Sequence, residues 1–577
     1  MIDLTIIVAG AAGQGMQTIS AILAKALTRQ GYYVHCSHDL MSRIRGGHNF
    51  TAVRISDRPV GAPAERANIL VALDRDSIDL HAGELVDDGV IVADSKFQIP
   101  NLEIPNRNVN PFPVPMEQLA AEHGRDKRMA NAVACGAVFS LMAYDVDVLA
   151  DTLGDIFSAK GDPVVEANIR AARAGHGFTE REFKGVCPYC TLHEKRAKPE
   201  RRLLLTGSEA IGYGALVAGV RFLSAYPMSP ATAVMEYLAA RQREVGGLLV
   251  EQAEDEIAAV NMAIGAAVAG ARAMTCTSGG GFALMAEGLS LAGMTEVPLV
   301  VYVAQRPGPA TGFPTRTEQG DLLFALHAGH GEFARAILCP GDAAEAVDAM
   351  ARAFNLADRY QTPVIVLGDQ QLGDSHWTVD VLDAGRVPID RGKLLETWDK
   401  SQGEYRRYQL SPDGASPRLA PGRTEQVQYW DSDEHTEEGH ITESAAVRRQ
   451  MTAKRLHKLK GLAADALPPV VHDRGDDVAL VGFGSTKHAV REAVDLLAGR
   501  GVKASAVHFP QAYPLHQETA ALLGDFLKVI VVEQNATGQF ARLLHSETGL
   551  KAHGSILRFD GRPLTAKYIV DSYTALE

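Results

Sequence analysis

Cysteine is scarce in this sequence, and its scarcity excludes two kinds of protein. Six cysteines among 577 residues are too few for a disulfide framework. Only Cys187 and Cys190 form a CxxC pair, and two thiols alone cannot hold a four-cysteine iron–sulfur cluster or a Cys₄ zinc site. We therefore expect no metal bound by this chain alone. We interpret the pair as free thiols in a linker, with partial metal ligation or redox chemistry as the alternatives.

Excess positive charge and long apolar runs are also missing. The 57 Lys and Arg residues are outnumbered by 70 Asp and Glu, and the formal charge of -13 argues against a general nucleic-acid-binding protein. No stretch is long and apolar enough to span a membrane, and the opening MIDLTIIVAG has the character of a strand rather than of a basic leader. We expect a cytoplasmic protein that binds neither nucleic acid nor membrane.

Glycine, in contrast, is abundant. A composition with 54 glycines and only 6% aromatic residues fits α/β architecture, and 577 residues are too many for one core. Apolar runs that alternate with helical stretches predict buried parallel sheets. We predict an α/β fold of several open parallel-sheet domains: a first domain at 1–186, a linker at 187–202, a second domain at 203–375, an irregular segment at 376–470 and a smaller third domain at 471–577.

A glycine-rich turn, GAAGQG, joins the first predicted strand to the first predicted helix. Backbone N–H groups at such a turn could hold a phosphate, although the spacing is not that of the dinucleotide fingerprint. The nearby SRIRGGH places arginines beside paired glycines, which suits an anionic group. A tight surface turn explains these features equally well. The candidate anion-binding residues are Gly13, Gln14, Gly15, Arg43, Arg45, Gly46 and Gly47.

Three loops of the second predicted domain each follow an apolar strand. They are AYPMSP at 225–230, TSGGG at 277–281 and AQRPGPATGFPTRTEQGDL at 304–322. In an open parallel sheet, ligands bind at the carboxyl ends of the strands. We therefore expect the three loops to converge on one crevice.

A predicted helix between two of these loops begins with a cluster of acids. The stretch EQAEDEIAAVNMAIGAAVAG, residues 251–270, places four carboxylates before a run of small and apolar residues. Acids in a first turn interact favourably with the helix dipole, and this alone could explain them. The alternative is that one acid is held in an apolar setting to control a proton on a cofactor.

Taken together with SPDGASPRLAPG at 411–422 and VVEQNATGQFARLL at 531–544, these motifs resemble the alpha subunit of the 2-oxoacid:ferredoxin oxidoreductases. The resemblance covers essentially the whole chain, in the form with a gamma-type domain fused in front, and is closest to the members that act on 2-oxoglutarate. It implies a gamma-type domain, a thiamine-pyrimidine-binding domain and a transketolase C-terminal-like domain, in that order.

The resemblance also implies a role for each candidate residue. Glu256 would bond to N1′ of thiamine diphosphate and favour the imino form that deprotonates the thiazolium C2. Glu254 and Asp255 would then only interact with the helix dipole. Tyr226, Pro227 and Met228 would contact the cofactor. The substrate would be bound by Ser229, Arg306, Thr315 and Arg316. The anion-binding candidates of the first domain would help to bind coenzyme A or to pack against another subunit.

Two family features are absent from this sequence: a GDG motif with a suitably spaced Asn, and four suitably placed cysteines. In the family both lie on a separate beta subunit. The resemblance therefore implies a beta subunit with Mg²⁺ and a 4Fe-4S cluster, a cofactor shared between two chains, ferredoxin as electron acceptor, and a dimer of alpha–beta heterodimers.

The implied reaction is the reversible oxidative decarboxylation of a 2-oxoacid, most directly 2-oxoglutarate, to an acyl-CoA. Three alternatives stay open: pyruvate or a branched-chain substrate, a nicotinamide-dependent dehydrogenase, and a non-catalytic scaffold subunit.

Overall fold

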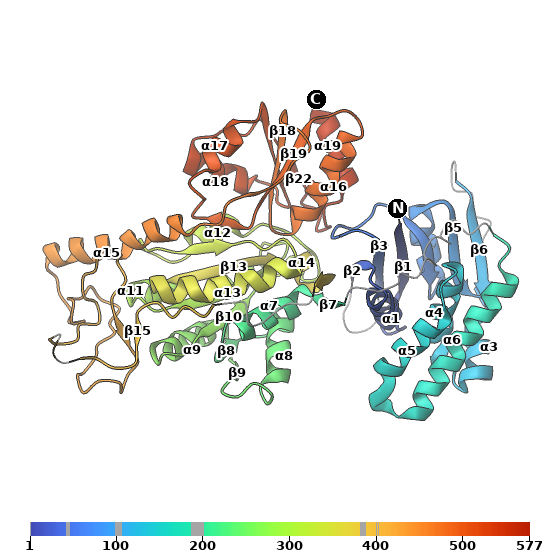
Figure 1. Ribbon diagram of the computed structural model, residues 1–577, viewed down its shortest axis with the longest axis horizontal. Helices are drawn as coiled ribbons and strands as arrows, with labels where there is room; N and C mark the ends of the chain where they lie inside the picture. The colour runs from blue at the N-terminus through green and yellow to red at the C-terminus, as the bar shows by residue number, and fades with distance from the viewer. Residues whose placement is uncertain are drawn as a thin grey trace. The chain divides into compact units, whose positions relative to one another are not determined.

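The computed structural model describes residues 2–41, 47–97, 107–185, 201–380, 388–399, 401 and 403–576. Within it the chain forms two compact units, one of residues 1–205 with 375–382 and one of residues 206–374 with 383–577 (Figure 1). Cys187 and Cys190 lie outside the described residues, and the other four cysteines are free and buried.

The first unit contains an eight-stranded sheet in the order β6-β5-β4-β1-β3-β2-β14-β7. Strands β1, β4, β5 and β6 are parallel, whereas β3 runs antiparallel to both β1 and β2. The bounds are β1 Asp3–Ala11, β2 Tyr33–Leu40, β3 His48–Ser56, β4 Ala67–Ala72, β5 Leu85–Asp94, β6 Val109–Val114, β7 Arg202–Thr206 and β14 His376–Asp380.

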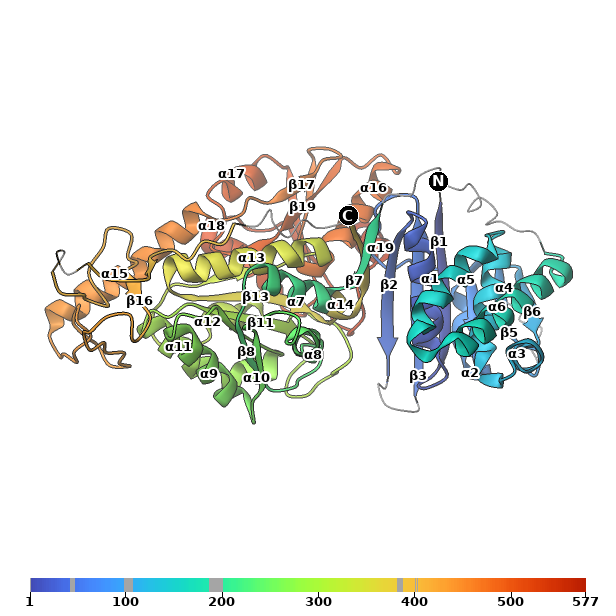
Figure 2. The same cartoon turned by 60° about the horizontal axis from the view of Figure 1, so that its bottom comes forward.

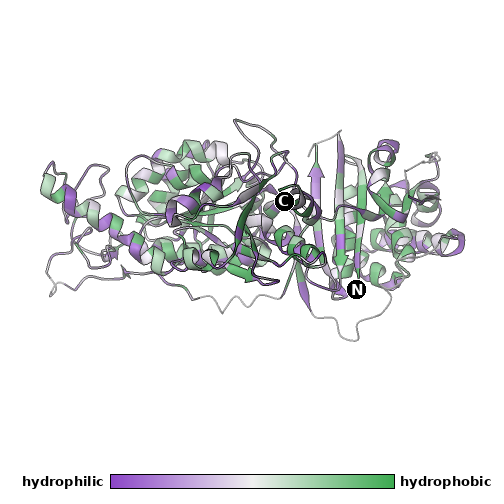
Figure 3. Ribbon diagram, turned by 90° about the horizontal axis from the view of Figure 1, so that it is seen from above, coloured by the Kyte–Doolittle hydropathy of each residue, from purple (hydrophilic) through white to green (hydrophobic). Residues whose placement is uncertain are grey.

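Buried residues pack against both faces of this sheet. Successive side chains of a strand point to opposite faces, so neighbouring residues of one strand belong to different cores. In β1, Ile6 and Val8 belong to one buried core while Ile7 and Ala9 belong to another. Figure 3 shows hydrophobic residues along these strands. The helices of the unit are α1 Met16–Arg29, α2 Arg75–His81, α3 Met116–Gly124, α4 Ala130–Leu141, α5 Val146–Phe157 and α6 Asp162–Glu182.

The second unit is built on a seven-stranded sheet in the order β20-β12-β13-β11-β10-β8-β9. Its strand pairs are parallel except for β12 with β20. The central strands β11 and β13 are buried along their whole length, which explains why their sequences are continuous apolar runs rather than alternating ones. The bounds are β8 Phe222–Ala225, β9 Leu249–Gln252, β10 Ala273–Thr277, β11 Leu299–Gln305, β12 Ala336–Leu338, β13 Pro363–Asp369 and β20 Gln511–Tyr513.

Helices cover both faces of this sheet. Figure 2 shows α7 and α13 on one side and α9, α10 and α11 on the other. The bounds are α7 Gly207–Val217, α8 Thr232–Arg241, α9 Glu256–Val268, α10 Gly279–Leu284, α11 Ala286–Met294, α12 Leu322–His327, α13 Ala343–Tyr360 and α14 Gln370–Asp374.

A second sheet in this unit is formed by the C-terminal residues, with five strands in the order β17-β19-β18-β21-β22. We call residues 470–576, which carry this sheet, the C-terminal domain. One strand of the C-terminal domain, β20, instead pairs with β12 and thereby belongs to the seven-stranded sheet. The bounds are β17 Val470–His472, β18 Val478–Phe483, β19 Ala504–Phe509, β21 Lys528–Glu533, β22 Gly554–Leu557, α16 Lys487–Ala498, α17 Thr519–Gly524, α18 Gln539–Thr548 and α19 Ala566–Leu576.

Between β14 and β17, the described residues form little regular structure apart from β15 Leu394–Leu395, β16 Arg418–Leu419 and α15 Ala445–Ala464. Helix α15 is polar, and a buried ion cluster anchors it. Lys454 and Lys458, one turn apart on one face, each reach the Glu296 carboxylate at 2.6 Å. The Arg407 side chain lies beside them and donates to the backbone carbonyl of Glu296 at 2.7 Å.

The charge balance of this cluster depends on a single carboxylate. Burial pushes the pKa of Glu296 up, but Lys454, Lys458 and Arg407 together hold it well below its usual range. Burial lowers the pKa of Lys458 to about 8 in spite of Glu296. Glu296 is therefore ionised and is the carboxylate that both buried lysines contact.

No helix among the described residues combines the length and the apolar character that a membrane crossing requires.

We predict that Glu296→Gln destabilises the protein by about 3–5 kcal/mol, because it leaves buried cations without their counter-charge. The measurement is the shift in the midpoint of urea denaturation. Glu117→Gln is the control, since Glu117 pairs with Lys96 on the surface and should change the midpoint little. Equal small shifts for the two variants would contradict the assignment of Glu296 as the anchor of α15.

Candidate active site

The three loops and the acid-headed helix follow neighbouring parallel strands. AYPMSP follows β8, TSGGG follows β10, the loop at 306–321 follows β11, and α9 begins shortly after β9. Parallel strands present their carboxyl ends at one edge of a sheet, which is where open α/β sheets bind ligands. The contacts described below show that side chains from these segments meet at that edge.

The first residue of α9 is Glu256, and its side chain is buried. The residue is 3% exposed, and its Oε1 atom has no hydrogen-bond partner. The residue before it, Asp255, caps the helix by accepting a hydrogen bond from the Ala258 N–H at 2.7 Å. Glu254 is exposed. The acids thus separate into one that caps the helix and one that is buried with an unsatisfied oxygen.

Gly281 makes room for the Glu256 carboxylate. A Cβ atom at residue 281 would lie 2.3 Å from Glu256 Oε1 and 2.1 Å from Thr277 Oγ1. Thr277 ends β10, and its hydroxyl also approaches the Met228 sulfur at 3.9 Å. The TSGGG turn is therefore packed directly against the buried acid, and its last glycine cannot carry a side chain without displacing that acid.

Arg306 links the β11 loop to the AYPMSP loop. Its Nη1 donates to the backbone carbonyl of Ser229 at 2.8 Å. Burial lowers the pKa of this half-buried arginine, and the charge of Asp321 partly offsets that effect. The arginine thus fixes the neighbouring loop through one donor while its guanidinium stays close to the sheet edge.

The other predicted residues of the second domain take varied positions. Tyr226 is 40% exposed, and Pro227, Met228 and Ser229 are half-buried. Thr315 is half-buried farther along the β11 loop. Arg316 packs toward the C-terminal domain, because a Cβ at Gly561 would lie 3.1 Å from the Arg316 Cβ. Among the described residues, Arg306 thus contacts Ser229, whereas Arg316 packs toward the C-terminal domain.

Sequence reasoning missed two acids of the same loop. Burial raises the pKa of Asp321 to about 6, an effect that Arg306 opposes, and its Oδ2 atom is buried without a hydrogen-bond partner. Burial, and then the charge of Asp321, raise the pKa of Glu318 to about 7. Both residues stand in the quoted TEQGDL motif, but nothing in the sequence distinguishes them from solvated loop acids.

The role of Gln319 and of the EQNATGQ motif was also missed. Gln319 donates through Nε2 to the Phe483 carbonyl and accepts through Oε1 from the Gln534 N–H, and its backbone carbonyl accepts from Asn535 Nδ2. Gln539 donates to the Gly320 carbonyl at 2.6 Å. The motif at 533–539 thus holds the end of the β11 loop against the C-terminal domain.

The candidate anion-binding residues of the first domain lie in the other unit. Gly13 and Gly15 have φ of 97° and 91°, which glycine adopts most easily, and Gly15 precedes α1. The Gln14 side chain accepts from the Ala11 N–H at 2.8 Å. Gly47 also has a positive φ of 72°. Arg43, Arg45 and Gly46 lie outside the described residues.

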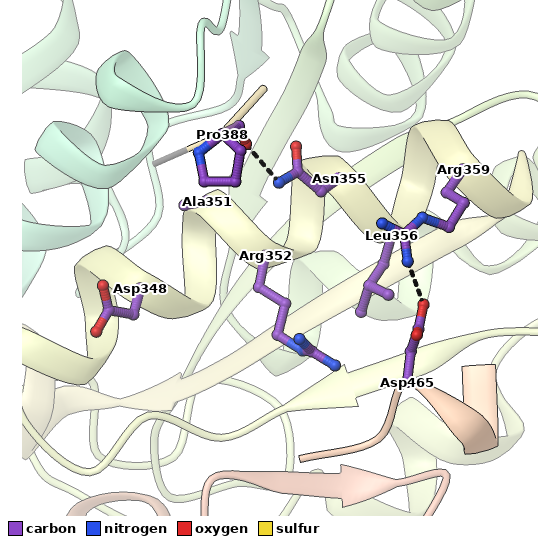
Figure 4. Close-up of a pocket in the computed structure, with 8 residues that line it drawn as sticks. All are labelled: Asp348, Ala351, Arg352, Asn355, Leu356, Arg359, Pro388 and Asp465. Carbon is purple, nitrogen blue, oxygen red and sulfur yellow. Dashed lines mark hydrogen bonds and ion pairs between the residues drawn. The ribbon is translucent and has the colours of Figure 1, made fainter. Parts of the chain in front are cut away.

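A cavity of about 490 Å³ lies along α13, on the face of the seven-stranded sheet opposite to α9. Figure 4 shows the Asn355 side chain turned toward Pro388 and Arg359 paired with Asp465 across it. Its position on the far face separates it from Glu256. The lining residues are Asp348, Ala351, Arg352, Asn355, Leu356, Arg359, Pro388 and Asp465.

Family models match three stretches of the chain. Residues 213–454 match the thiamine-diphosphate-binding domain of pyruvate flavodoxin/ferredoxin oxidoreductases. Residues 5–178 match the pyruvate ferredoxin/flavodoxin oxidoreductase model, and residues 469–559 match the transketolase C-terminal domain.

Individual proteins are similar over nearly the whole chain. A 2-oxoacid:ferredoxin oxidoreductase subunit alpha from Sulfolobus is 32% identical, covering 96% of this chain and 94% of its own. The 2-oxoglutarate oxidoreductase subunit KorA of Mycobacterium tuberculosis is 27% identical, covering 93% and 86%. The solved structure of 2-oxoglutarate:ferredoxin oxidoreductase from Magnetococcus marinus, with 2-oxoglutarate, coenzyme A and succinyl-CoA bound, has a TM-score of 0.93 at 32% identity and covers 100% of both chains.

The fold, the site and these matches define an α/β oxidoreductase subunit with a thiamine-diphosphate-binding domain. The chain belongs to the 2-oxoacid:ferredoxin oxidoreductase family, in which its relatives are alpha subunits of multi-subunit enzymes. The predicted family and the predicted α/β fold class are confirmed.

We predict that Gly281→Ala abolishes most of the enzyme activity, because the new methyl group would displace the Glu256 carboxylate. Gly280→Ala is the matched control, since a Cβ one residue earlier in the same turn meets nothing within 4 Å. The measurement is turnover by the assembled enzyme, together with the denaturation midpoint of each variant. Equal activity of the two variants would contradict the proposed packing.

Proposed function

We propose that this chain is the alpha subunit of an enzyme that oxidatively decarboxylates 2-oxoglutarate with coenzyme A, giving succinyl-CoA and CO₂, and passes the electrons to ferredoxin. The observation that carries the proposal is the buried, unsatisfied Oε1 of Glu256 at the head of α9. The names of the KorA relatives and of the Magnetococcus structure support 2-oxoglutarate as the substrate.

The residues around Glu256 suit the aminopyrimidine ring of thiamine diphosphate. A buried carboxylate oxygen without a partner costs about 1–3 kcal/mol, and a ring nitrogen that carries or shares a proton would remove that cost. Gly281 keeps the space beside the carboxylate free of side-chain atoms. Tyr226, Pro227 and Met228 would lie beside the ring. When bound, thiamine diphosphate supplies the carbon nucleophile and the electron sink that decarboxylation needs.

In this arrangement Glu256 holds and moves a proton at the ring nitrogen. The surrounding small residues exclude water, so the proton is shared with the cofactor rather than with solvent. Asp255 keeps the carboxylate in place indirectly, because its cap fixes the first turn of α9. Glu254, which is exposed and precedes the capping residue Asp255, has no part in this step.

The substrate would be bound by side chains of the β8 and β11 loops. Arg306 offers a planar set of donors, of which one is used on the Ser229 carbonyl. Its remaining donors suit a carboxylate, and the Ser229 hydroxyl lies on the adjoining loop. Thr315 and Arg316 extend the same loop and would complete a site for the second carboxylate of 2-oxoglutarate.

The rest of the reaction requires a second subunit. The described part of the chain contains no group of three or more His, Cys, Asp or Glu side chains that could hold a metal ion. We assign Mg²⁺, the diphosphate site and the 4Fe-4S cluster to a beta subunit, and assembly to a dimer of alpha–beta heterodimers. Exposed apolar side chains on the segments that form the site suit such a partner: Tyr226, Ile257, Leu284 and Phe313. Gly13, Gln14, Gly15, Arg43, Arg45, Gly46 and Gly47 remain candidates for coenzyme A or for packing.

Reconstitution tests the proposal. We predict that the chain expressed alone is colourless and reduces no dye with any 2-oxoacid, and that coexpression with the beta subunit gives a brown complex. That complex should reduce ferredoxin only when 2-oxoglutarate and coenzyme A are both present, with pyruvate as the control substrate. Stoichiometric iron and sulfide in the isolated chain would contradict the assignment of the iron–sulfur cluster to the beta subunit. A preference for pyruvate would contradict the assignment of 2-oxoglutarate as the substrate.

We further predict that Arg306→Ala lowers kcat/KM for 2-oxoglutarate, by an amount that corresponds to about 3 kcal/mol of activation free energy. The reason is that a carboxylate of the bound substrate loses its cationic partner. The loss for 2-oxobutyrate, which has one carboxylate fewer, should be smaller. Arg316→Ala serves as the second variant on the same loop. Equal losses for the two substrates would mean that Arg306 binds the carboxylate that all 2-oxoacids share, and the selectivity would then lie with Arg316 or the partner.

A further inference from the structure

The cavity along α13 has one wall in which the charged groups are bonded to one another. Arg359 donates to Asp390 Oδ2 through Nε at 2.9 Å and through Nη2 at 2.6 Å, and to Asp465 Oδ2 through Nη1 at 2.6 Å. Asp465 also accepts a hydrogen bond from the Tyr360 hydroxyl at 2.8 Å. All three guanidinium nitrogens of Arg359 are thus engaged with carboxylates of the protein.

A second wall is held in place by Asn355. Its Nδ2 donates to the Pro388 carbonyl at 2.8 Å, and its Oδ1 accepts from the Asp390 N–H at 3.0 Å and from Arg272 Nη2 at 2.8 Å. These bonds fasten the chain at 388–390 to α13. All the residues that line the cavity belong to one compact unit of the chain.

Arg352, which also lines the cavity, differs from Arg359 because its guanidinium has no partner. Its Nε atom is buried without a hydrogen bond, and no hydrogen bond or ion pair joins the side chain to any described residue. Figure 4 shows this side chain extending from α13 on the side where Asp465 lies. A buried donor without an acceptor is destabilising, and more so when it belongs to a charged group. An acceptor bound in the cavity would remove that cost.

The lining of the cavity favours an acceptor with a single negative charge. Two arginines and two aspartates line it, so the aspartates would repel a ligand that carries two or more negative charges. A guanidinium presents its donors in a planar fork, which matches the two oxygens of a carboxylate. A monocarboxylate therefore suits Arg352 better than a phosphate does.

The remaining lining residues favour a short apolar body on that ligand. Ala351 and Leu356 of α13 and the ring of Pro388 line the same cavity as Arg352. The volume of about 490 Å³ lies within the range of small-molecule sites, which are lined mainly by apolar side chains with a few polar groups that fix the ligand.

We propose that the cavity along α13 is a binding site for a short-chain aliphatic monocarboxylate. The carboxylate of the ligand accepts hydrogen bonds from Arg352, and its hydrocarbon chain packs against Ala351 and Leu356. The cavity lies on the face of the seven-stranded sheet opposite to α9, so a ligand bound there does not occupy the candidate active site at Glu256. The inference is independent of the proposed function, because it uses none of the residues assigned to the 2-oxoacid or to the cofactor.

Titration calorimetry on the full-length chain tests this site, with butanoate as the probe. One butanoate should bind per chain, with a Kd in the millimolar range that is expected of so small a ligand. Butanamide, which has nearly the same shape but no charge, should bind at least about tenfold more weakly, and so should inorganic phosphate. This comparison of ligands needs no variant.

Arg352→Gln should weaken butanoate binding at least about tenfold, because it removes the cationic partner of the carboxylate. Its denaturation midpoint should stay close to that of the wild type, since Arg352 has no bond within the protein to lose. Ala351→Leu is a second variant, which adds side-chain atoms to the cavity and should also weaken binding. Arg170→Gln, which removes an exposed arginine of α6, is the matched control and should leave binding unchanged.

Arg306→Ala shows which of the two sites butanoate occupies. Unchanged binding in that variant supports the cavity along α13, and lost binding would place butanoate in the candidate active site and overturn the proposal. Wild-type affinity in both Arg352→Gln and Ala351→Leu would also overturn it, as would phosphate or butanamide binding as tightly as butanoate. Absence of any butanoate binding to the wild-type chain would overturn it directly.

Discussion

The arrangement of the candidate active site depends on one constraint: two buried carboxylate oxygens are packed against Gly279 and Gly281 in the first turn of α10. Glu256 Oε1 lies against Gly281 and Asp321 Oδ2 lies against Gly279, with neither oxygen hydrogen-bonded. Such oxygens are destabilising in a folded protein unless a ligand or a proton satisfies them. Hydrogen bonds on both sides hold the backbone that bears these carboxylates.

The helix and the loop that bear these carboxylates are held by hydrogen bonds. The cap of α9 fixes the first turn that bears Glu256, and Gln305 at the end of β11 fixes the backbone of Asp321. The C-terminal domain also holds the β11 loop: Gln319 of the loop donates to the Phe483 carbonyl, and Gln539 donates to the Gly320 carbonyl of the loop. The loop that bears Arg306 and Asp321 is therefore held by hydrogen bonds from both sheet-containing parts of this unit.

The sequence predicted the fold class well because the signals were strong and local. Continuous apolar runs predicted buried parallel strands, and β11 and β13 have that character. The antiparallel β3 was not predicted, since the pairing of a strand depends on its partners rather than on its own residues. The three loops were found because each follows a strand, and the contacts of Arg306 with Ser229 and of Thr277 with Met228 join them.

The site residues were predictable only in part. Family resemblance selected Glu256 among its neighbours, and the burial of Glu256 beside the capping Asp255 is a distinction that composition alone could not make. Asp321 was missed because its carboxylate is packed against Gly279, which belongs to a different loop. The role of the EQNATGQ motif was missed for the same reason: each of its bonds to the β11 loop spans more than two hundred residues.

The central claim is that Glu256 controls a proton on thiamine diphosphate. The most direct measurement is hydrogen–deuterium exchange at the thiazolium C2 of the cofactor bound to the assembled enzyme, in the absence of substrate. The account predicts that Glu256→Ala slows this exchange by roughly two to four orders of magnitude, whereas Glu254→Ala, at an exposed position just before the capping residue Asp255, leaves it unchanged. An exchange rate in Glu256→Ala equal to that of the wild type would contradict it.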